Sequence, residues 1–261
     1  MRHINDRFVQ DLLNGELSYF LKQVKDHPQS LSLEIRKGYI NIYYKGGSLL
    51  KIKQKRKGYT FRFDAKYCKN KDNDRNFDLL SSLPTDDAKA YETHLSLMME
   101  EMDSWFLAHP KPERDFQHRL LVNNPEIVDI EYQVGRRMRL DMLLYSHGKL
   151  IIVENKYGTG AISGKAGLSE HYKDICTVLQ DPHLLQEMLD SVCHISRAKN
   201  ALGLRDMLIE QNDIKRVEIL FLLANYDSKS KTLDNELTMM NNEIPVNIMF
   251  VPGDHTKIDF K

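Results

Sequence analysis

The sequence lacks the features that mark a secreted or membrane-bound protein. Cysteine is scarce: Cys68, Cys176 and Cys193 are the only three, and their spacing fits neither a disulfide framework nor a zinc site. We therefore expect a reducing compartment. The first residues, Met1 to Asp11, are charged rather than apolar, and no run approaches the length of a membrane span. These absences predict a cytoplasmic protein with no membrane partner.

Net charge is absent as well, since 37 Lys and Arg residues balance 37 Asp and Glu residues. A neutral chain binds a polyanion only where its basic residues gather locally. The 261 residues suit one elaborated domain or two small ones. We predict an N-terminal helix and antiparallel β module in residues 1–84, followed by a larger core in residues 85–261.

The chemically distinctive residues fall on two predicted strands, Met138 to Tyr145 and Lys149 to Tyr157. If His147-Gly148 forms a two-residue turn between them, Asp141 lies directly opposite Glu154 on the same face of the pair. A longer turn would need a bulge to restore that register. The pattern therefore predicts two close carboxylates.

Two close carboxylates favour a hard divalent cation, Mg²⁺ or Mn²⁺, held by oxygen ligands. Lys156, two residues after Glu154, points to the same face of its strand. There it could orient an attacking water or stabilise a charged transition state. The alternative is a surface strand with an ordinary Glu/Lys pair. The apolar run Leu150 to Val153 fits that alternative poorly, because it indicates a strand buried on both faces.

Asp141, twelve intervening residues and then Glu154-Asn155-Lys156 resemble the catalytic pattern of the PD-(D/E)xK nuclease superfamily. Leu140 stands in the place of the nominal proline of that pattern. The resemblance covers roughly Glu113 to Tyr172. It implies a restriction endonuclease-like αβββαβ core, in which helices flank a central mixed sheet. Periodicity alone predicts only an α/β or α+β fold.

The resemblance also implies an activity, that of a Mg²⁺- or Mn²⁺-dependent nuclease which hydrolyses phosphodiester bonds, with DNA as the favoured substrate. Asp141, Glu154 and Glu113 would hold the metal together with the backbone carbonyl of Asn155, and Lys156 would act on the water. The alternative for Glu113 is a first-turn acid that the helix dipole favours.

Further residues around the motif are candidates for nucleic-acid contact. Arg137 and Arg139 lie close to Asp141 in sequence, and Lys165 lies in the glycine-rich loop after the motif. The resemblance implies that the helix from Leu168 to Leu179 steers the substrate, which makes its Tyr172 a candidate. We expect His171 on that helix to be a surface or satisfied polar residue.

The N-terminal module is predicted to be an antiparallel meander rich in lysine, arginine and tyrosine. Within it Lys51, Lys53 and Lys55 alternate, which places them on one strand face. Such a surface could hold a phosphate backbone and stack bases. Lysines also protect edge strands and aromatics pack sheets, so a purely structural module is the alternative. The predicted strands are Leu31 to Arg36, Tyr39 to Lys45, Ser48 to Gln54 and Tyr59 to Phe63.

Two functions are therefore compatible with the sequence. The first is the metal-dependent nuclease. The second is a catalytically inactive nucleic-acid-binding or sensing module on the same fold, with the basic meander as its working surface. A homodimer is compatible with both. Metal-dependent turnover, and its loss when Asp141 is replaced, separates the two.

Overall fold

The structure is a computed structural model that describes residues 1–68, 75–135, 138–158, 162–164, 167–240 and 243–260. The chain forms two compact units. The N-terminal unit comprises Arg2–Asp115 and Arg197–Asp206, and the C-terminal unit comprises Met1, Phe116–Ser196 and Met207–Lys261. No helix in the described part of the chain is long and apolar enough to cross a membrane.

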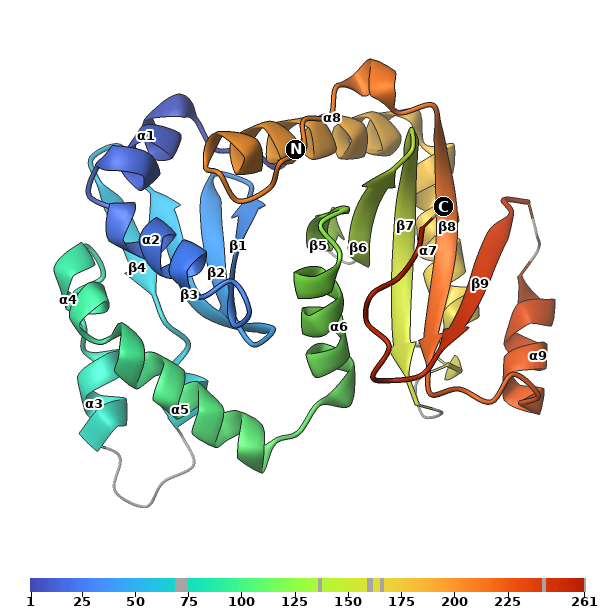
Figure 1. The fold of residues 1–261 in the computed structure, drawn as a ribbon, viewed down its shortest axis with the longest axis horizontal. Helices are drawn as coiled ribbons and strands as arrows, with labels where there is room; N and C mark the ends of the chain where they lie inside the picture. Colours follow the sequence, from blue (N-terminus) through green and yellow to red (C-terminus); the bar gives the residue numbers. More distant parts are fainter. Residues whose placement is uncertain (69–74, 136–137, 159–161, 165–166, 241–242, 261) are drawn as a thin grey trace. The chain divides into compact units, whose positions relative to one another are not determined.

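The N-terminal unit is built on the predicted antiparallel meander. Its strand order is β1-β2-β3-β4, with antiparallel pairing throughout (Figure 1). The strands are β1 (Leu31–Arg36), β2 (Tyr39–Tyr44), β3 (Gly47–Gln54) and β4 (Tyr59–Arg62). Alternation gives this sheet one apolar face and one more polar face, and β1 and β2 are largely buried on both.

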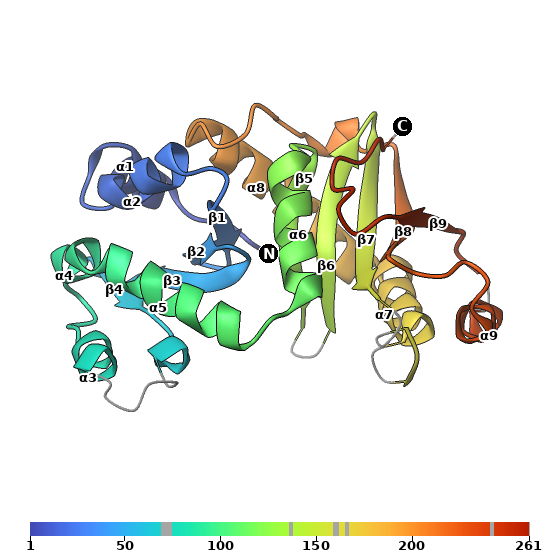
Figure 2. The same cartoon turned by 60° about the horizontal axis from the view of Figure 1, so that its bottom comes forward.

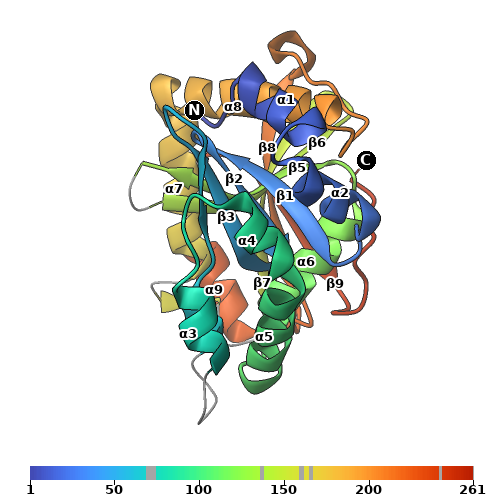
Figure 3. The same ribbon diagram turned by 90° about the vertical axis from the view of Figure 1, so that its left-hand side faces the viewer.

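Helices cover the apolar face of the N-terminal sheet through aromatic contacts. The ring centroids of Phe8 and Tyr59 are 4.8 Å apart, those of Phe20 and Phe61 5.7 Å, and those of Phe61 and Tyr91 5.2 Å. Figure 3 shows α4 and α5 in front of this sheet. The helices of the unit are α1 (Asp6–Asn14), α2 (Ser18–Asp26), α3 (Arg75–Ser81), α4 (Ala88–Thr93) and α5 (Leu95–Ala108), with a 3₁₀ turn η1 (Ala65–Cys68).

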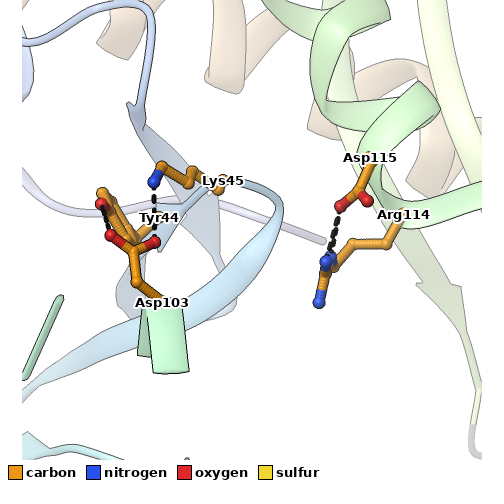
Figure 4. Close-up of polar contacts among 5 residues, drawn as sticks. All are labelled: Tyr44, Lys45, Asp103, Arg114 and Asp115. Atoms are coloured by element: carbon orange, nitrogen blue, oxygen red, sulfur yellow. Dashed lines mark hydrogen bonds and ion pairs between the residues drawn. The ribbon is translucent and has the colours of Figure 1, made fainter. Parts of the chain in front are cut away.

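The boundary between the units differs from the predicted division at residue 84. Helix α5 belongs with the N-terminal sheet because Asp103 accepts hydrogen bonds from the Tyr44 hydroxyl at 2.9 Å and from Lys45 Nζ at 2.7 Å (Figure 4). The unit ends beyond Arg114, whose guanidinium lies 3.8 Å from the Phe106 ring centroid and binds Asp115. Contacts between side chains far apart in sequence therefore set this boundary, and composition does not reveal them.

The C-terminal unit follows the predicted order of helix, three strands, helix and strand. Its sheet has the order β5-β6-β7-β8-β9 and is mixed, since β5, β6 and β7 pair antiparallel whereas β7, β8 and β9 pair parallel. The elements are α6 (Pro112–Asn123), β5 (Ile127–Val134), β6 (Met138–Ser146), β7 (Lys149–Tyr157), α7 (Leu168–Gln180), α8 (Pro182–Ala201), η3 (Gln211–Asp213), β8 (Arg216–Ala224), α9 (Lys231–Met239) and β9 (Val246–Val251).

Helices α6 and α7 lie on opposite faces of this mixed sheet (Figures 1 and 2). On one face the Phe116 ring of α6 lies 5.7 Å from the Tyr157 ring of β7. On the other face His171 of α7 contacts Glu154, three residues before Tyr157 on the same strand. Side chains an odd number of residues apart on a strand point to opposite faces. The centre of β7 is consequently buried on both sides.

Candidate active site

The predicted register of the motif hairpin is present. His147 and Gly148 form a two-residue turn in which both residues have positive φ, 50° and 77°. The antiparallel register that starts at this turn reaches Met142 and Val153, one step before Asp141 and Glu154. Asp141 and Glu154 therefore occupy opposite positions and share the face that α7 covers.

Two backbone interactions hold Asp141 in place. Its Oδ2 accepts a hydrogen bond from the backbone N–H of Asn155 at 3.1 Å. Its own carbonyl oxygen accepts one from the Gln117 side chain of α6 at 3.2 Å. The N–H and C=O of a strand residue point to the same neighbouring strand. The carbonyl of Asn155 thus lies on the edge that faces Asp141, where it could add an oxygen ligand.

Glu154 is a buried acid whose carboxylate is only partly satisfied. The residue is 1% exposed, and its Oε1 lies 3.0 Å from Lys156 Nζ and 3.0 Å from His171 Nδ1. Neither contact has the angles of a hydrogen bond, so Oε1 is a buried oxygen without a hydrogen-bond partner. Burial, followed by the charge of Asp141, raises the pKa of the Glu154 carboxyl well above its ordinary value, against the lowering effect of Lys156.

His171 is the site residue whose place the sequence did not predict. Its Nε2 lies 3.1 Å from Lys156 Nζ, and its Nδ1 lies beside Glu154. Burial, followed by the positive charges of Lys156 and Arg139, lowers the pKa of His171 to about 4. Of the two expected alternatives, a surface residue or a satisfied polar residue, the structure therefore shows the second, a half-buried histidine with polar partners. A sequence signal existed, because His171 follows Leu168 at helical spacing on the buried side of α7.

Helix α7 is anchored on both sides of His171. Near its first turn Glu236 Oε2 accepts hydrogen bonds from the N–H and the hydroxyl of Ser169, at 3.0 and 2.7 Å. One residue after His171, the Tyr172 hydroxyl donates to the carbonyl of Ile244 at 3.1 Å and accepts from its N–H at 3.0 Å. Tyr172 is 2% exposed, so the prediction that it contacts nucleic acid is corrected: it is a core residue that fixes α7.

The two acids fit a divalent cation in part. In the described portion of the chain no three His, Cys, Asp or Glu side chains are gathered into a ready ligand set. Mg²⁺, however, is commonly held by one or two carboxylates while it keeps several waters. Asp141 and Glu154 meet that need, and a cation would add a ligand contact to Oε1 of Glu154, which has ion-pair contacts but no hydrogen bond. The residues present therefore suit Mg²⁺ or Mn²⁺ better than a metal that requires a closed protein cage.

The remaining candidates near the motif are not all brought to this site. Glu113 lies half-buried in the first turn of α6 and belongs to the N-terminal unit, so its role as a metal ligand stays a prediction. Arg139 is exposed and pairs with Glu131 at 3.4 Å. It lies two residues before Asp141 on β6 and therefore on the same face of the sheet, where its charge lowers the pKa of His171. Arg137 and Lys165 lie outside the described residues.

The basic meander carries a local excess of positive charge. Ten basic residues stand against two acidic ones between positions 31 and 66, in a chain whose net charge is zero. Lys51 pairs with Arg62 across the sheet, and Lys53 two residues later shares its face, as predicted. Burial, followed by Lys53 and Arg62, lowers the pKa of Lys51, whose Nζ lies 4.0 Å from the Tyr39 ring centroid.

Lys55 departs from the prediction, because it lies beyond the end of β3 in the loop to β4, where its N–H binds the carbonyl of Gly58 at 3.0 Å. An open hollow of about 690 Å³ is lined there by Lys53, Gln54, Lys55, Arg56 and Lys57. None of its cations pairs with an acid in the described part of the chain. This hollow offers uncompensated positive charge to solvent.

Comparison of the chain with family models, with curated proteins and with solved structures gives no significant match. The resemblance to the PD-(D/E)xK superfamily therefore rests on the sequence motif alone and stays a prediction. Function is accordingly inferred from the site.

Proposed function

We propose that the protein is a Mg²⁺- or Mn²⁺-dependent nuclease that hydrolyses phosphodiester bonds of nucleic acid, with DNA as the favoured substrate. The observation that carries the proposal is the Glu154 carboxylate. It is buried, faces Asp141 and Lys156, and has an oxygen without a hydrogen bond. A buried acid with a raised pKa and a specific charged neighbour is typical of a functional site.

The chemistry follows from the residues on that face. Asp141 and Glu154 would hold the cation, with the carbonyl of Asn155 as a further oxygen ligand. When bound, such a cation polarises a phosphoryl oxygen and lowers the pKa of water. Lys156 supplies a fixed positive charge beside the acids, where it would orient water or offset the negative charge that develops on the phosphate.

A second function, nucleic-acid binding without cleavage, is favoured by the hollow on the basic meander. Its four cations without acidic partners suit the phosphate backbone of any sequence. This surface would serve a nuclease equally well as a substrate-binding region. Cleavage of nucleic acid, and not affinity for it, therefore distinguishes the nuclease from the binding module.

Incubation of the purified protein with supercoiled plasmid, labelled linear DNA and labelled RNA tests the proposal. Each substrate is treated with Mg²⁺, Mn²⁺ or EDTA, and Asp141→Asn is compared with Asp254→Asn, a change at an exposed acid of the same unit. We expect metal-dependent cleavage by wild type and by Asp254→Asn but not by Asp141→Asn. Binding without cleavage under all conditions would support the binding module instead.

A further inference from the structure

We propose that His171 is a positioning residue of this site, which accepts a hydrogen bond from Lys156 and so fixes the direction of its ammonium group toward the substrate. This inference rests on the proposed nuclease function. Its basis is a closed set of three contacts: Lys156 Nζ to Glu154 Oε1 at 3.0 Å, His171 Nδ1 to the same oxygen at 3.0 Å, and Lys156 Nζ to His171 Nε2 at 3.1 Å.

The protonation pattern of the imidazole follows from the chemistry of its two neighbours. A lysine ammonium group has three donors and no acceptor, so Nε2 of His171 must accept the hydrogen bond from Lys156. The ring proton therefore resides on Nδ1, which lies beside the carboxylate of Glu154. If the ring were a protonated imidazolium, its Nε2–H would point at the ammonium group of Lys156, and two donors would face each other. The geometry thus requires the neutral Nδ1–H tautomer.

His171 restricts a side chain that would otherwise be mobile. Lysine carries its charge on a flexible four-carbon stem, and it loses reach and direction unless its head group is held. Glu154 attracts the ammonium group, but without the angles of a hydrogen bond. His171 supplies the directional contact. Of the three N–H groups of Lys156, at least one then remains for a water molecule or a phosphate oxygen.

The imidazole can act in this way because its own position is fixed. Ser169, two residues before it, is tied to Glu236, and Tyr172, one residue after it, is tied to the backbone of Ile244. Charged groups surround the ring from each neighbouring strand and from its own helix, namely Arg139 on β6, Glu154 and Lys156 on β7 and Glu170 on α7. A side chain held by such outer contacts keeps the geometry that catalysis needs.

Two substitutions separate positioning from mere packing. His171→Gln keeps a carbonyl acceptor for Lys156 and an N–H donor for Glu154, whereas His171→Leu keeps bulk without either. We expect His171→Leu to lower kcat about 100-fold with KM changed less than about threefold, and His171→Gln to restore most of kcat. His183→Leu, at an exposed position of α8, is the control and should match wild type. Equal kcat for His171→Leu and wild type would overturn the inference.

A second measurement is independent of cleavage. Nitrogen chemical shifts of the histidine side chains in the metal-free, full-length protein at neutral pH report the tautomer directly. We expect His171 to carry its proton on Nδ1, and Lys156→Met to weaken this preference because the donor to Nε2 is gone while Glu154 still faces Nδ1. A proton on Nε2 in wild type contradicts the inference, whether or not the protein cleaves DNA. The predicted tautomer without any metal-dependent cleavage instead means that the proposed function is wrong and the contact is structural.

Discussion

Lys156 on β7 and Lys53 on β3 are the same residue type in the same kind of element, yet their surroundings are opposite. Lys156 is 4% exposed and lies between an acid and an imidazole. Lys53 is exposed and has no acidic partner in the described part of the chain. A buried charge persists only with compensation, whereas a solvated one needs none. Burial and neighbouring groups, not residue type, therefore distinguish the two lysines. The buried one can act on a single atom of a substrate, whereas the exposed one adds only to the electrostatic potential of a surface.

The largest expected effect concerns the buried lysine. Replacing Lys156 by Met should lower turnover by a factor of roughly 10² to 10⁴, because it removes a group that acts in the transition state. Mn²⁺ affinity should stay near that of wild type, since an ammonium group is not a metal ligand. Asp141→Asn should lose both turnover and Mn²⁺ binding. Calorimetry and cleavage of labelled DNA measure the two quantities, and near-wild-type cleavage by the Lys156 variant would refute the mechanism.

The N-terminal unit has a buried lysine of its own, which extends the comparison. Lys199 and Glu34 are 3% and 1% exposed and lie 2.7 Å apart. Lys199→Met leaves the carboxylate buried without this partner, and should lower the free energy of unfolding by about 3–5 kcal/mol. The exposed pair of Lys45 with Asp103 is the control, and Lys45→Met should cost at most about 1 kcal/mol. Similar urea midpoints for the two variants would contradict the distinction.

Metal binding should be visible in the stability of the protein. Because a cation binds only the folded pair Asp141 and Glu154, Mn²⁺ at 100 times its Kd should stabilise wild type by about 2.7 kcal/mol. The raised pKa of Glu154 makes protons compete with the metal, so at a fixed Mn²⁺ concentration the gain should be larger at pH 8 than at pH 5. Thermal melts of wild type and Asp141→Asn test this. An equal Mn²⁺ effect in both would count against the site.

Smaller effects are expected from the lysines of the basic meander. Reversing the charge of Lys51, Lys53 and Lys55 should weaken DNA binding and reduce the slope of log affinity against log salt by about 3, at about 0.9 per lost phosphate contact. Reversing Lys229 and Lys231, exposed lysines of the C-terminal unit, should leave that slope unchanged. Titrations of fluorescent DNA with each variant at several salt concentrations measure the affinity and this slope. An unchanged slope for the triple variant would make the meander a structural module.

The smallest effect is a pH dependence of folding stability in EDTA. The pKa of His171 is lowered to about 4 in the folded state, so the unfolded chain binds a proton first as the pH falls. The histidine therefore lowers stability progressively from about pH 6.5 down to pH 4. His171→Gln should remove this loss, on the order of 1 kcal/mol after allowance for partial exposure. His183→Gln, at an exposed site, should keep it.

Local chemistry made the hairpin and the meander predictable. Gly148 after His147 specified the turn, and strand alternation then set Asp141 against Glu154. Contacts across long sequence distances were not predictable in this way. Glu236 meets Ser169 across 67 residues, and no spacing rule connects them. His171 lay between these cases, because its helical spacing indicated burial but not which polar groups it would meet.

The break at His94 between α4 and α5 has no clear signal in the sequence. The apolar stripe runs through both helices, and Tyr91 and Met98 are both buried. The spacing of the apolar residues therefore predicts one continuous helix. Packing of Tyr91 on Phe61 then fixes the direction of α4 separately. Tertiary contact overrode the local pattern here.

The turn at His147 and Gly148 makes the site unequally tolerant of changes in chain length. Two residues are the shortest common connection of a hairpin, and three-residue loops also occur. An extra residue can therefore be absorbed in the turn without moving either strand. If one residue is removed from the turn, the turn cannot become shorter, so the pairing of the two strands shifts by one position. Asp141 would then stand opposite Val153 or Asn155 and no longer opposite Glu154, so a deletion at this distant turn separates the two acids while both remain in the sequence.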